Sequence, residues 1–439
     1  MLKQLNWIVG VCVCLLMLSS SLALAYDYPF DNPYIATVLN TPAEFTYDLP
    51  RETPVKIDTI KMFPEREIPG ILWNFDELRY SYIRQKGPAP LIFLVAGTGA
   101  SFHSAKMQIM QKAFYQAGYH VISLSSPTHP NFIVAASTSG VPGHLVEDSA
   151  DLYRVMQAIW QKLSKKMEVT EFFLSGYSLG AAESAFIAKL DEQEKAFNFR
   201  KVLLINPPVS LYNSVLILDE MLEHNIPGGN DNFNAFYQSL IKGLTEVYVH
   251  GDDIEFNDQF LYQVYRYRKP KSDKKVAALI GVDFRISSRN MVFVSDVLTK
   301  AGYAVPKGLE LGRHDNATDY LKVTSRLSFI DYFEGLFLPH FRAKDPNISE
   351  RDLTRQMSLR YIEYYLRTSP KFGLIHNEDD IILLPGEIDY LRDLFGSRAQ
   401  IFPHGGHCGN MAYPDNVTAM LDFFKAVNKN SGGYDNDNR

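Results

Sequence analysis

Ser178 has the neighbours that a nucleophilic serine requires. Gly176, Ser178 and Gly180 form a Gly-x-Ser-x-Gly pattern, which follows an apolar strand-like run at 172–174 and precedes a helix-forming stretch at 181–188. A sharp turn between strand and helix presents the serine hydroxyl where a base and a substrate can both reach it. The flanking glycines are required because a Cβ in so tight a turn would collide with neighbouring backbone. This context predicts nucleophilic chemistry at Ser178.

An acid and a base follow later, each after a strand-like run. Asp379 and Asp380 come after the apolar run 372–376, and His404 and His407 come after the run 399–402. A serine hydroxyl needs a base to accept its proton, and the base needs an acid to hold its tautomer and stabilise its charged form. The chain order of serine, aspartate and histidine, with the last two after successive strands, predicts a catalytic triad.

These motifs together resemble the α/β-hydrolase fold superfamily, over about residues 85–210 and 370–428, without matching a particular family within it. The resemblance implies that Ser178 is the nucleophile and His407 the base. It favours Asp380 as the acid because Ile381 and Ile382 follow it, with Asp379 as the alternative. His407 is favoured over His404 because its flanking glycines resemble the loop that presents the base in this superfamily.

The same resemblance implies an oxyanion hole built from two backbone N–H groups. One belongs to Leu179, the residue after the nucleophile, and the other to the loop 96–99, where we choose Thr98. Relatives often have His-Gly in this loop, whereas this chain has Ala96-Gly97.

Strand-like runs alternate with helical stretches on both sides of a long helical region. The runs at 90–96, 119–124, 171–174 and 201–206 alternate with helical stretches, which predicts βαβ units and a mostly parallel central sheet flanked by helices. We therefore expect an α/β fold, with residues 26–87 as an N-terminal extension with edge strands. The hydrolase core would span 88–208 and 368–430, a large helical cap 209–367, and a disordered tail 431–439. The cap should cover Ser178.

The first 25 residues have the pattern of a secretory signal peptide. Lys3 precedes an apolar run at 7–18, and the small-residue site Ala23-Leu24-Ala25 would place cleavage before Tyr26. The run is too short for an ordinary membrane span, although an uncleaved N-terminal anchor is an alternative. We expect an exported protein, periplasmic or secreted, without a stable transmembrane span after signal removal.

Composition and motifs argue against several other classes. The net charge of −6 and the lack of a concentrated basic surface argue against nucleic-acid binding, and the basic run 266–275 is expected to be a solvated loop. Phe102 stands where a dinucleotide-binding Gly-x-Gly-x-x-Gly needs its last glycine, and no Gly-Lys-Ser/Thr phosphate loop occurs. The histidines lack metal-ligand spacing. We expect neither a cofactor nor a metal.

The sequence therefore predicts an exported serine hydrolase that cleaves an ester or another acyl bond through an acyl-enzyme intermediate. Its partner would be a small-molecule or lipid-like acyl substrate, with an esterase or lipase as the first choice. A peptidase or an acyltransferase with the same triad, or a non-catalytic binding protein that kept the fold, is the alternative. Oligomeric state, acyl chain length and signal cleavage are left open.

Overall fold

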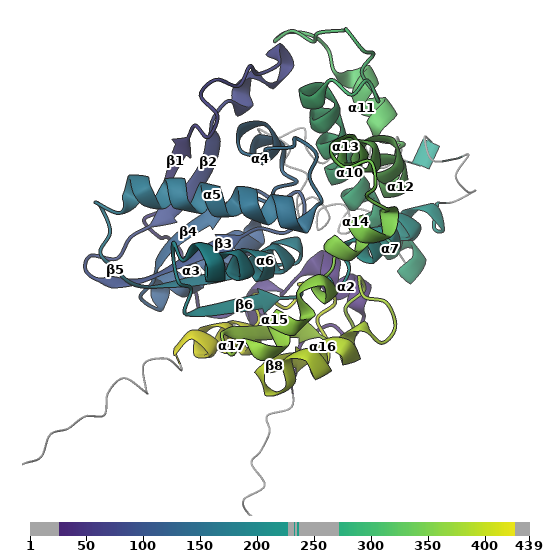
Figure 1. Ribbon diagram of the computed structural model, residues 1–439. Helices are drawn as coiled ribbons and strands as arrows, with labels where there is room; N and C mark the ends of the chain where they lie inside the picture. Colours follow the sequence, from purple (N-terminus) through teal and green to yellow (C-terminus); the bar gives the residue numbers. More distant parts are fainter. Residues whose placement is uncertain (1–25, 227–231, 233–234, 237–271, 426–439) are drawn as a thin grey trace, which may run out of the picture.

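An eight-stranded sheet lies at the centre of the computed structural model (Figure 1). The structure describes residues 26–226, 232, 235–236 and 272–425; the expected signal peptide and the expected tail lie outside them. The strand order is β1-β2-β4-β3-β5-β6-β7-β8. β2 pairs antiparallel with both of its neighbours, β1 and β4, and all the other neighbouring strands pair parallel. The strands are β1 (Lys56–Ile60), β2 (Leu78–Ile83), β3 (Ala89–Val95), β4 (His120–Leu124), β5 (Val169–Tyr177), β6 (Lys201–Ile205), β7 (Phe372–Asn377) and β8 (Ala399–Phe402).

Both faces of this sheet are buried, as the continuous apolar run at β3 predicts. Leu91, Phe93 and Val95 join one hydrophobic cluster, and Ile92 and Leu94 join another. Successive side chains of a strand point to opposite faces, so an uninterrupted apolar run fits a strand covered on both sides. The predicted α/β class is confirmed.

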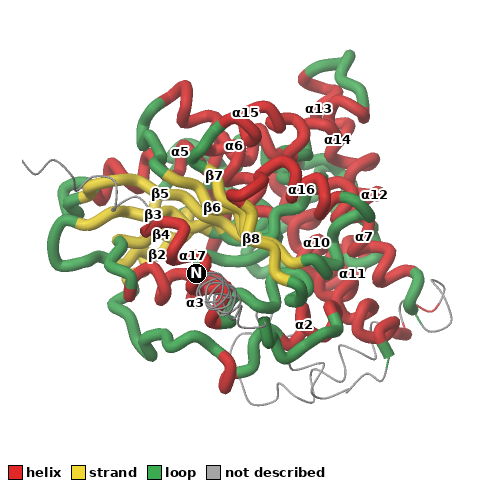
Figure 2. The backbone as a smooth tube through the Cα atoms, turned by 90° about the horizontal axis from the view of Figure 1, so that it is seen from below, coloured by secondary structure: helices red, strands yellow, loops and turns green. Residues whose placement is uncertain are grey.

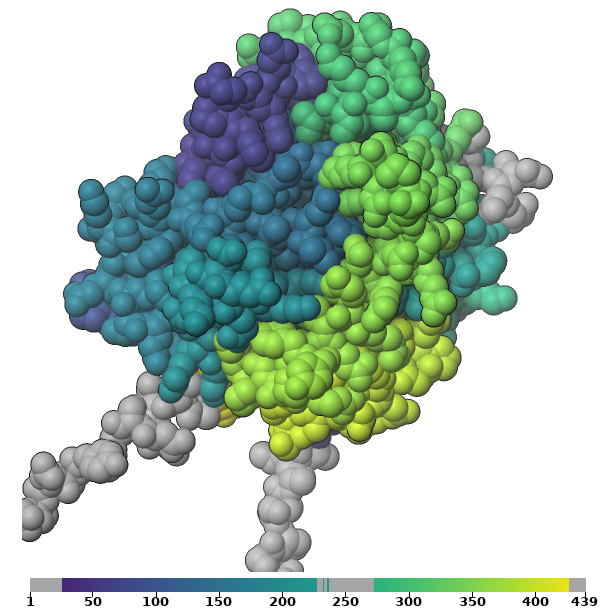
Figure 3. Space-filling view, in the orientation of Figure 1, coloured from purple at the N-terminus to yellow at the C-terminus, as the bar shows by residue number. Residues whose placement is uncertain are grey.

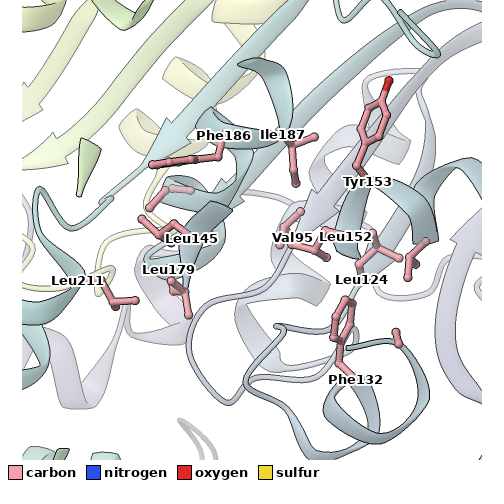
Figure 4. Close-up of a cluster of buried hydrophobic side chains, with 14 of the residues drawn as sticks. Val95, Leu124, Phe132, Leu145, Leu152, Tyr153, Leu179, Phe186, Ile187 and Leu211 are labelled. Atoms are coloured by element: carbon pink, nitrogen blue, oxygen red, sulfur yellow. The ribbon is translucent and has the colours of Figure 1, made fainter. Parts of the chain in front are cut away.

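Helices cover the two faces. The covering helices are α3 (Ala105–Gln116), α5 (Leu145–Leu163), α6 (Leu179–Glu194), α16 (Glu387–Phe395) and α17 (Pro414–Lys425), with the short α4 (Pro130–Ala135) beside them. Seen from below, α5 and α6 lie on one side of the sheet, and α3 and α17 lie on the other (Figure 2). Figure 4 shows side chains of the core under α5 and α6, with Leu179 and Leu211 at one side of it.

The described part of the chain between β6 and β7 consists of helices joined by loops, with a long loop at 300–317. It contains α7 (Leu211–Glu223), α10 (Asp273–Thr299), α11 (Thr318–Thr324), α12 (Phe329–Tyr332), α13 (Leu338–Lys344), α14 (Glu350–Gln356) and α15 (Glu363–Thr368), with a π-helical turn at Phe333–Phe337. Most of these helices gather at one end of the sheet (Figure 1). The predicted helical insertion is thus present. The exposed residues 273–275 of the basic run begin α10, so the expectation of a loop is wrong there, while 266–271 lie outside the described residues.

The N-terminal segment has contacts beyond the edge strands that the sequence predicts. Its β1 is the outermost strand, but α2 (Pro33–Leu39) packs against α10 and against the loop that carries His407. The Ile71 N–H donates to the Leu311 carbonyl, so this segment also contacts the insertion, as Figure 3 shows in purple and green. Within residues 26–226 and 272–425, no helix has both the length and the apolar character that crossing a membrane requires.

Candidate active site

Ser178 sits in a strained turn between the last residue of β5 and the first residue of α6. Its φ of 54° and ψ of −126° lie in a region that non-glycine residues rarely adopt. A Cβ at Gly176 would lie 2.3 Å from the Gly180 carbonyl oxygen, and one at Gly180 would lie 2.3 Å from the Val95 carbonyl oxygen. The expected reason for both glycines is therefore present in the packing: the turn and β3 leave no room for a side chain.

The structure brings Ser178, His407 and Asp380 together in a hydrogen-bonded chain. His407 Nε2 lies 2.9 Å from Ser178 Oγ, and His407 Nδ1 lies 3.0 Å and 3.1 Å from the two Asp380 carboxylate oxygens. A carboxylate can only accept, so Nδ1 carries the proton and donates to Asp380. Nε2 then presents its lone pair to the serine O–H. An imidazole held in this tautomer can accept the serine proton.

Electrostatics support this arrangement. Burial disfavours the charged form of His407, but the Asp380 carboxylate outweighs burial and raises the histidine pKa above its usual value. Burial acts in the opposite sense on Asp380, and the nearby His407 outweighs it, so that the pKa of this carboxyl is lowered. Asp380 therefore stays ionised and stabilises a positive imidazolium.

Asp379 and His404, the two alternatives, have different surroundings. The Asp379 carboxylate accepts hydrogen bonds from the N–H groups of Gly405 (3.3 Å) and Gly406 (2.9 Å), and so holds the loop that carries His407. The His404 side chain is 41% exposed and lies about 4.0 Å from Asp379 rather than near Ser178. The geometry thus favours Asp380 as the histidine partner and gives Asp379 a positioning contact.

Two further residues lie against Asp380, and neither was expected from the sequence: Asn206 forms a hydrogen bond to it, whereas His376 lies beyond hydrogen-bond distance. The Asn206 amide donates to Asp380 Oδ2 at 2.9 Å, and the fully buried His376 lies 3.7 Å from the same oxygen. The Ile382 N–H donates to the other carboxylate oxygen at 3.1 Å. Asn206 and His376 stand at the ends of β6 and β7, so the signal for them was a polar residue at the carboxyl end of a buried strand.

The His407 loop is held by residues from two distant segments. The His407 N–H donates to Thr37 Oγ1 of α2 at 2.9 Å, and the Asn377 amide donates to the Gly406 carbonyl at 2.8 Å. Within the loop, the side-chain amide of Asn410 donates to the side-chain oxygen of Asn377 at 2.7 Å. No sequence motif marks Thr37, because its role depends on how α2 packs against the loop.

The two expected oxyanion donors lie beside Ser178. A Cβ at Gly97 would lie 3.1 Å from Ser178 Cβ, so the loop 97–99 touches the nucleophile. Leu179 and Thr98 line the same cavity as Ser178. The Leu179 N–H belongs to the first turn of α6, where N–H groups lack helical acceptors. Both residues therefore remain the expected donors to an oxygen bound in front of Ser178.

A cavity of about 320 Å³ opens in front of Ser178 and His407. Its walls come from the core and from the insertion, which contributes residues of α7 and α10, among them Leu211, Val215, Ile280 and Phe284. The insertion therefore covers the site, as expected from its departure after β6. Two charged side chains, Lys106 of α3 and Asp283 of α10, also line the cavity.

In the part of the chain that the structure describes, no group of three or more histidine, cysteine, aspartate or glutamate side chains is arranged to hold a metal ion. Cys408 is free, buried, and lines the cavity with its Sγ 3.9 Å from His407 Nε2.

No family model and no curated protein matches this chain. Among solved structures, it is similar to a thioesterase domain from the curacin biosynthetic pathway, with 10% identity over 85% of this chain and 100% of that chain and a TM-score of 0.38. It is also similar to an esterase from Rhizomucor miehei, with 12% identity over 88% of this chain and 87% of that chain and a TM-score of 0.41. An esterase from Pyrobaculum calidifontis is similar too, with 14% identity over 86% of this chain and 85% of that chain and a TM-score of 0.40. At these scores the likeness carries no conclusion about activity. The strand order, the elbow at Ser178 and the acid and histidine loops after β7 and β8 give this chain the α/β-hydrolase fold.

Proposed function

We propose that this protein is an exported serine hydrolase that cleaves an ester or another acyl bond through an acyl-enzyme intermediate. The observation that carries the proposal is the hydrogen-bonded chain from Ser178 Oγ through His407 to Asp380, open to a cavity. Export follows from the signal-like residues 1–25 of the sequence.

In the first half of the reaction, Ser178 Oγ attacks the carbonyl carbon of the substrate while its proton passes to His407 Nε2. Asp380 stays ionised and stabilises the imidazolium. The carbonyl oxygen gains negative charge as the tetrahedral intermediate forms. The N–H groups of Leu179 and Thr98 donate to that oxygen, which lowers the barrier because the donors are already in place.

In the second half, the intermediate collapses and the leaving group departs with the proton that His407 returns. Water then enters, His407 takes its proton, and attack on the acyl-enzyme releases the acid and restores Ser178. The insertion limits the access of bulk water to this step, since α7 and α10 form part of the wall.

Labelling with a fluorophosphonate probe tests the proposal. The wild-type protein should react at Ser178, identified by peptide mass spectrometry, and should hydrolyse p-nitrophenyl acetate. Ser178→Ala and His407→Ala should each lower kcat by about four to six orders of magnitude while the protein remains folded. Ser164→Ala, an exposed serine, is the control and should behave as wild type. A folded wild-type protein that neither reacts nor turns over any ester would identify it as a non-catalytic member of the fold.

A further inference from the structure

A second, smaller cavity, here called the side channel, adjoins the main cavity next to the expected oxyanion residues. The two spaces share Thr98, Leu179 and Phe284, and the channel continues to Met291 and Tyr332. Its volume is about 30 Å³, against about 320 Å³ for the main cavity. This space holds about two water-sized positions, so a short acyl chain fits it and a long one does not.

The surface that the channel exposes is almost wholly apolar, and three hydroxyl groups of its lining residues have hydrogen-bond partners. Thr128 Oγ1 accepts from the Gly99 N–H at 2.7 Å, and Ser288 Oγ donates to the Phe284 carbonyl at 2.9 Å. The Tyr332 hydroxyl donates to the Pro142 carbonyl at 2.7 Å. With these groups satisfied, a polar ligand would lose its hydrogen bonds to water on entry, whereas methylene groups would gain from burial.

The main cavity is more polar than the channel, although apolar side chains also line it. His407 lines it, as do the charged Lys106 and Asp283 and the polar Asn290, and none of these four lines the channel. The leaving group must lie next to His407 Nε2, because this nitrogen returns the proton to it. The leaving group therefore occupies the main cavity, and the channel beside Leu179 and Thr98 remains for the acyl group.

We propose that the substrate joins a short acyl chain, seated in this channel, to a polar leaving group that occupies the cavity beside Lys106 and Asp283. This inference rests on the proposed hydrolase function and adds the orientation and the chemical class of the two halves of the substrate.

Two residues that line the channel, Tyr332 and Phe329, are held in place by hydrogen bonds. Tyr332 is anchored to Pro142, and the neighbouring Phe329, which also lines the channel, donates its N–H to the Asp219 carboxylate. Asp219 is itself paired with the buried Arg285 of α10 at 2.6 Å. A wall fixed in this way gives a sharp upper limit of acyl length rather than a gradual decline.

Two substitutions on α10 test the channel and the main cavity separately. Of these two spaces, Ser288 lines only the channel and Asn290 only the main cavity, so Ser288→Leu and Asn290→Leu each place a leucine side chain at one space and not at the other. Both proteins are assayed with p-nitrophenyl esters from acetyl to decanoyl, and with acetyl esters of glycerol and of hexanol. Thermal unfolding and fluorophosphonate labelling of Ser178 establish that each protein is folded and has a reactive site.

The wild-type protein should prefer butanoyl over both acetyl and decanoyl esters. Ser288→Leu should lower the ratio of kcat/KM for butanoyl over acetyl esters by about tenfold or more, since one methylene in a fitted pocket is worth that factor. Asn290→Leu should leave this ratio unchanged and instead shift preference from the glycerol ester towards the hexanol ester. Equal acyl-length profiles for wild type and Ser288→Leu, or an acyl-length shift in Asn290→Leu, would overturn the inference. In either case, labelling at Ser178 would leave the hydrolase proposal standing, whereas absence of labelling in the wild type would refute that proposal itself.

Discussion

Asp379 and Asp380 are neighbours in the chain but have different partners. Asp380 is buried and contacts the His407 ring, while Asp379 accepts from the backbone of the histidine loop. Only Asp380 can therefore stabilise the charged imidazolium directly. Asp379 affects the site through the position of the loop.

The pH dependence of turnover should distinguish the two acids. His407 must be neutral to accept the serine proton, so kcat/KM should rise with pH through the histidine pKa. Because Asp380 raises this pKa, the midpoint should lie above about 6.5, the usual value for histidine. Asp380→Asn removes the stabilising charge, so the midpoint should move to lower pH while kcat falls by about 10⁴-fold.

Asp379→Asn is the matched control for that measurement. This substitution should lower kcat far less than Asp380→Asn and leave the midpoint of the pH profile near the wild-type value. The reason is that Asp379 contacts the backbone of Gly405 and Gly406 rather than the His407 ring. The pH profile of kcat/KM for p-nitrophenyl acetate measures both effects. A downward shift in Asp379→Asn together with an unchanged midpoint in Asp380→Asn would exchange the two assignments.

At the scale of single elements, the junction of β5 and α6 depends on a side chain being absent. A Cβ at Gly180 would lie 2.3 Å and 2.5 Å from the carbonyl oxygens of Val95 and Ala96, which belong to a central strand and its end and cannot move aside. Gly180→Ala should therefore destabilise the fold by about 3 kcal/mol or more. Gly87→Ala, where the new Cβ meets no atom within 4 Å, should stay within about 0.5 kcal/mol of wild type. Urea unfolding compares the two; similar midpoints would contradict the close approach.

The contact of α2 with the histidine loop makes a second prediction at this scale. Thr37→Val keeps the shape of the side chain but removes the acceptor for the His407 N–H. The loop should lose its fixed position, and kcat should fall by about tenfold, since misplacement of a catalytic group is costly. Thr46→Val removes only an exposed local hydrogen bond and should leave kcat unchanged. Equal kcat values for both variants would show that α2 does not position His407.

At the scale of the whole molecule, a buried ion pair joins the two cap helices that line the cavity. Asp219 of α7 and Arg285 of α10 are 2.6 Å apart with side chains 6% and 4% exposed, whereas Lys300 and Glu310 form an exposed pair. Asp219→Ala would remove the carboxylate that balances the positive charge of the buried Arg285 guanidinium. The substitution should lower the free energy of unfolding by about 3–5 kcal/mol. Glu310→Ala should cost about 1 kcal/mol or less. Calorimetry that found equal losses for the two variants would contradict this assignment.

Much of the fold follows from patterns that are local in the chain. The run at β3, the elbow around Ser178 and the alternation of strands with helices indicate their structures through side-chain periodicity and turn sterics, which involve residues close in sequence. The order of Ser178, the acid and His407 followed in the same way, because each stands just after a buried strand. The sequence thus determined the fold class and the presence of a helical insertion, and it predicted a triad of Ser178, His407 and an acid, with Asp380 favoured over Asp379.

Only the tertiary structure decided which groups complete the site. Thr37 lies 370 residues from His407 in the chain, and Asn206 lies 174 residues from Asp380. The side channel likewise requires Leu179, Met291 and Tyr332 to meet from three helices. A hydrogen bond or a cavity wall between such distant residues leaves no periodic pattern in the sequence, because it arises from how finished elements pack against one another.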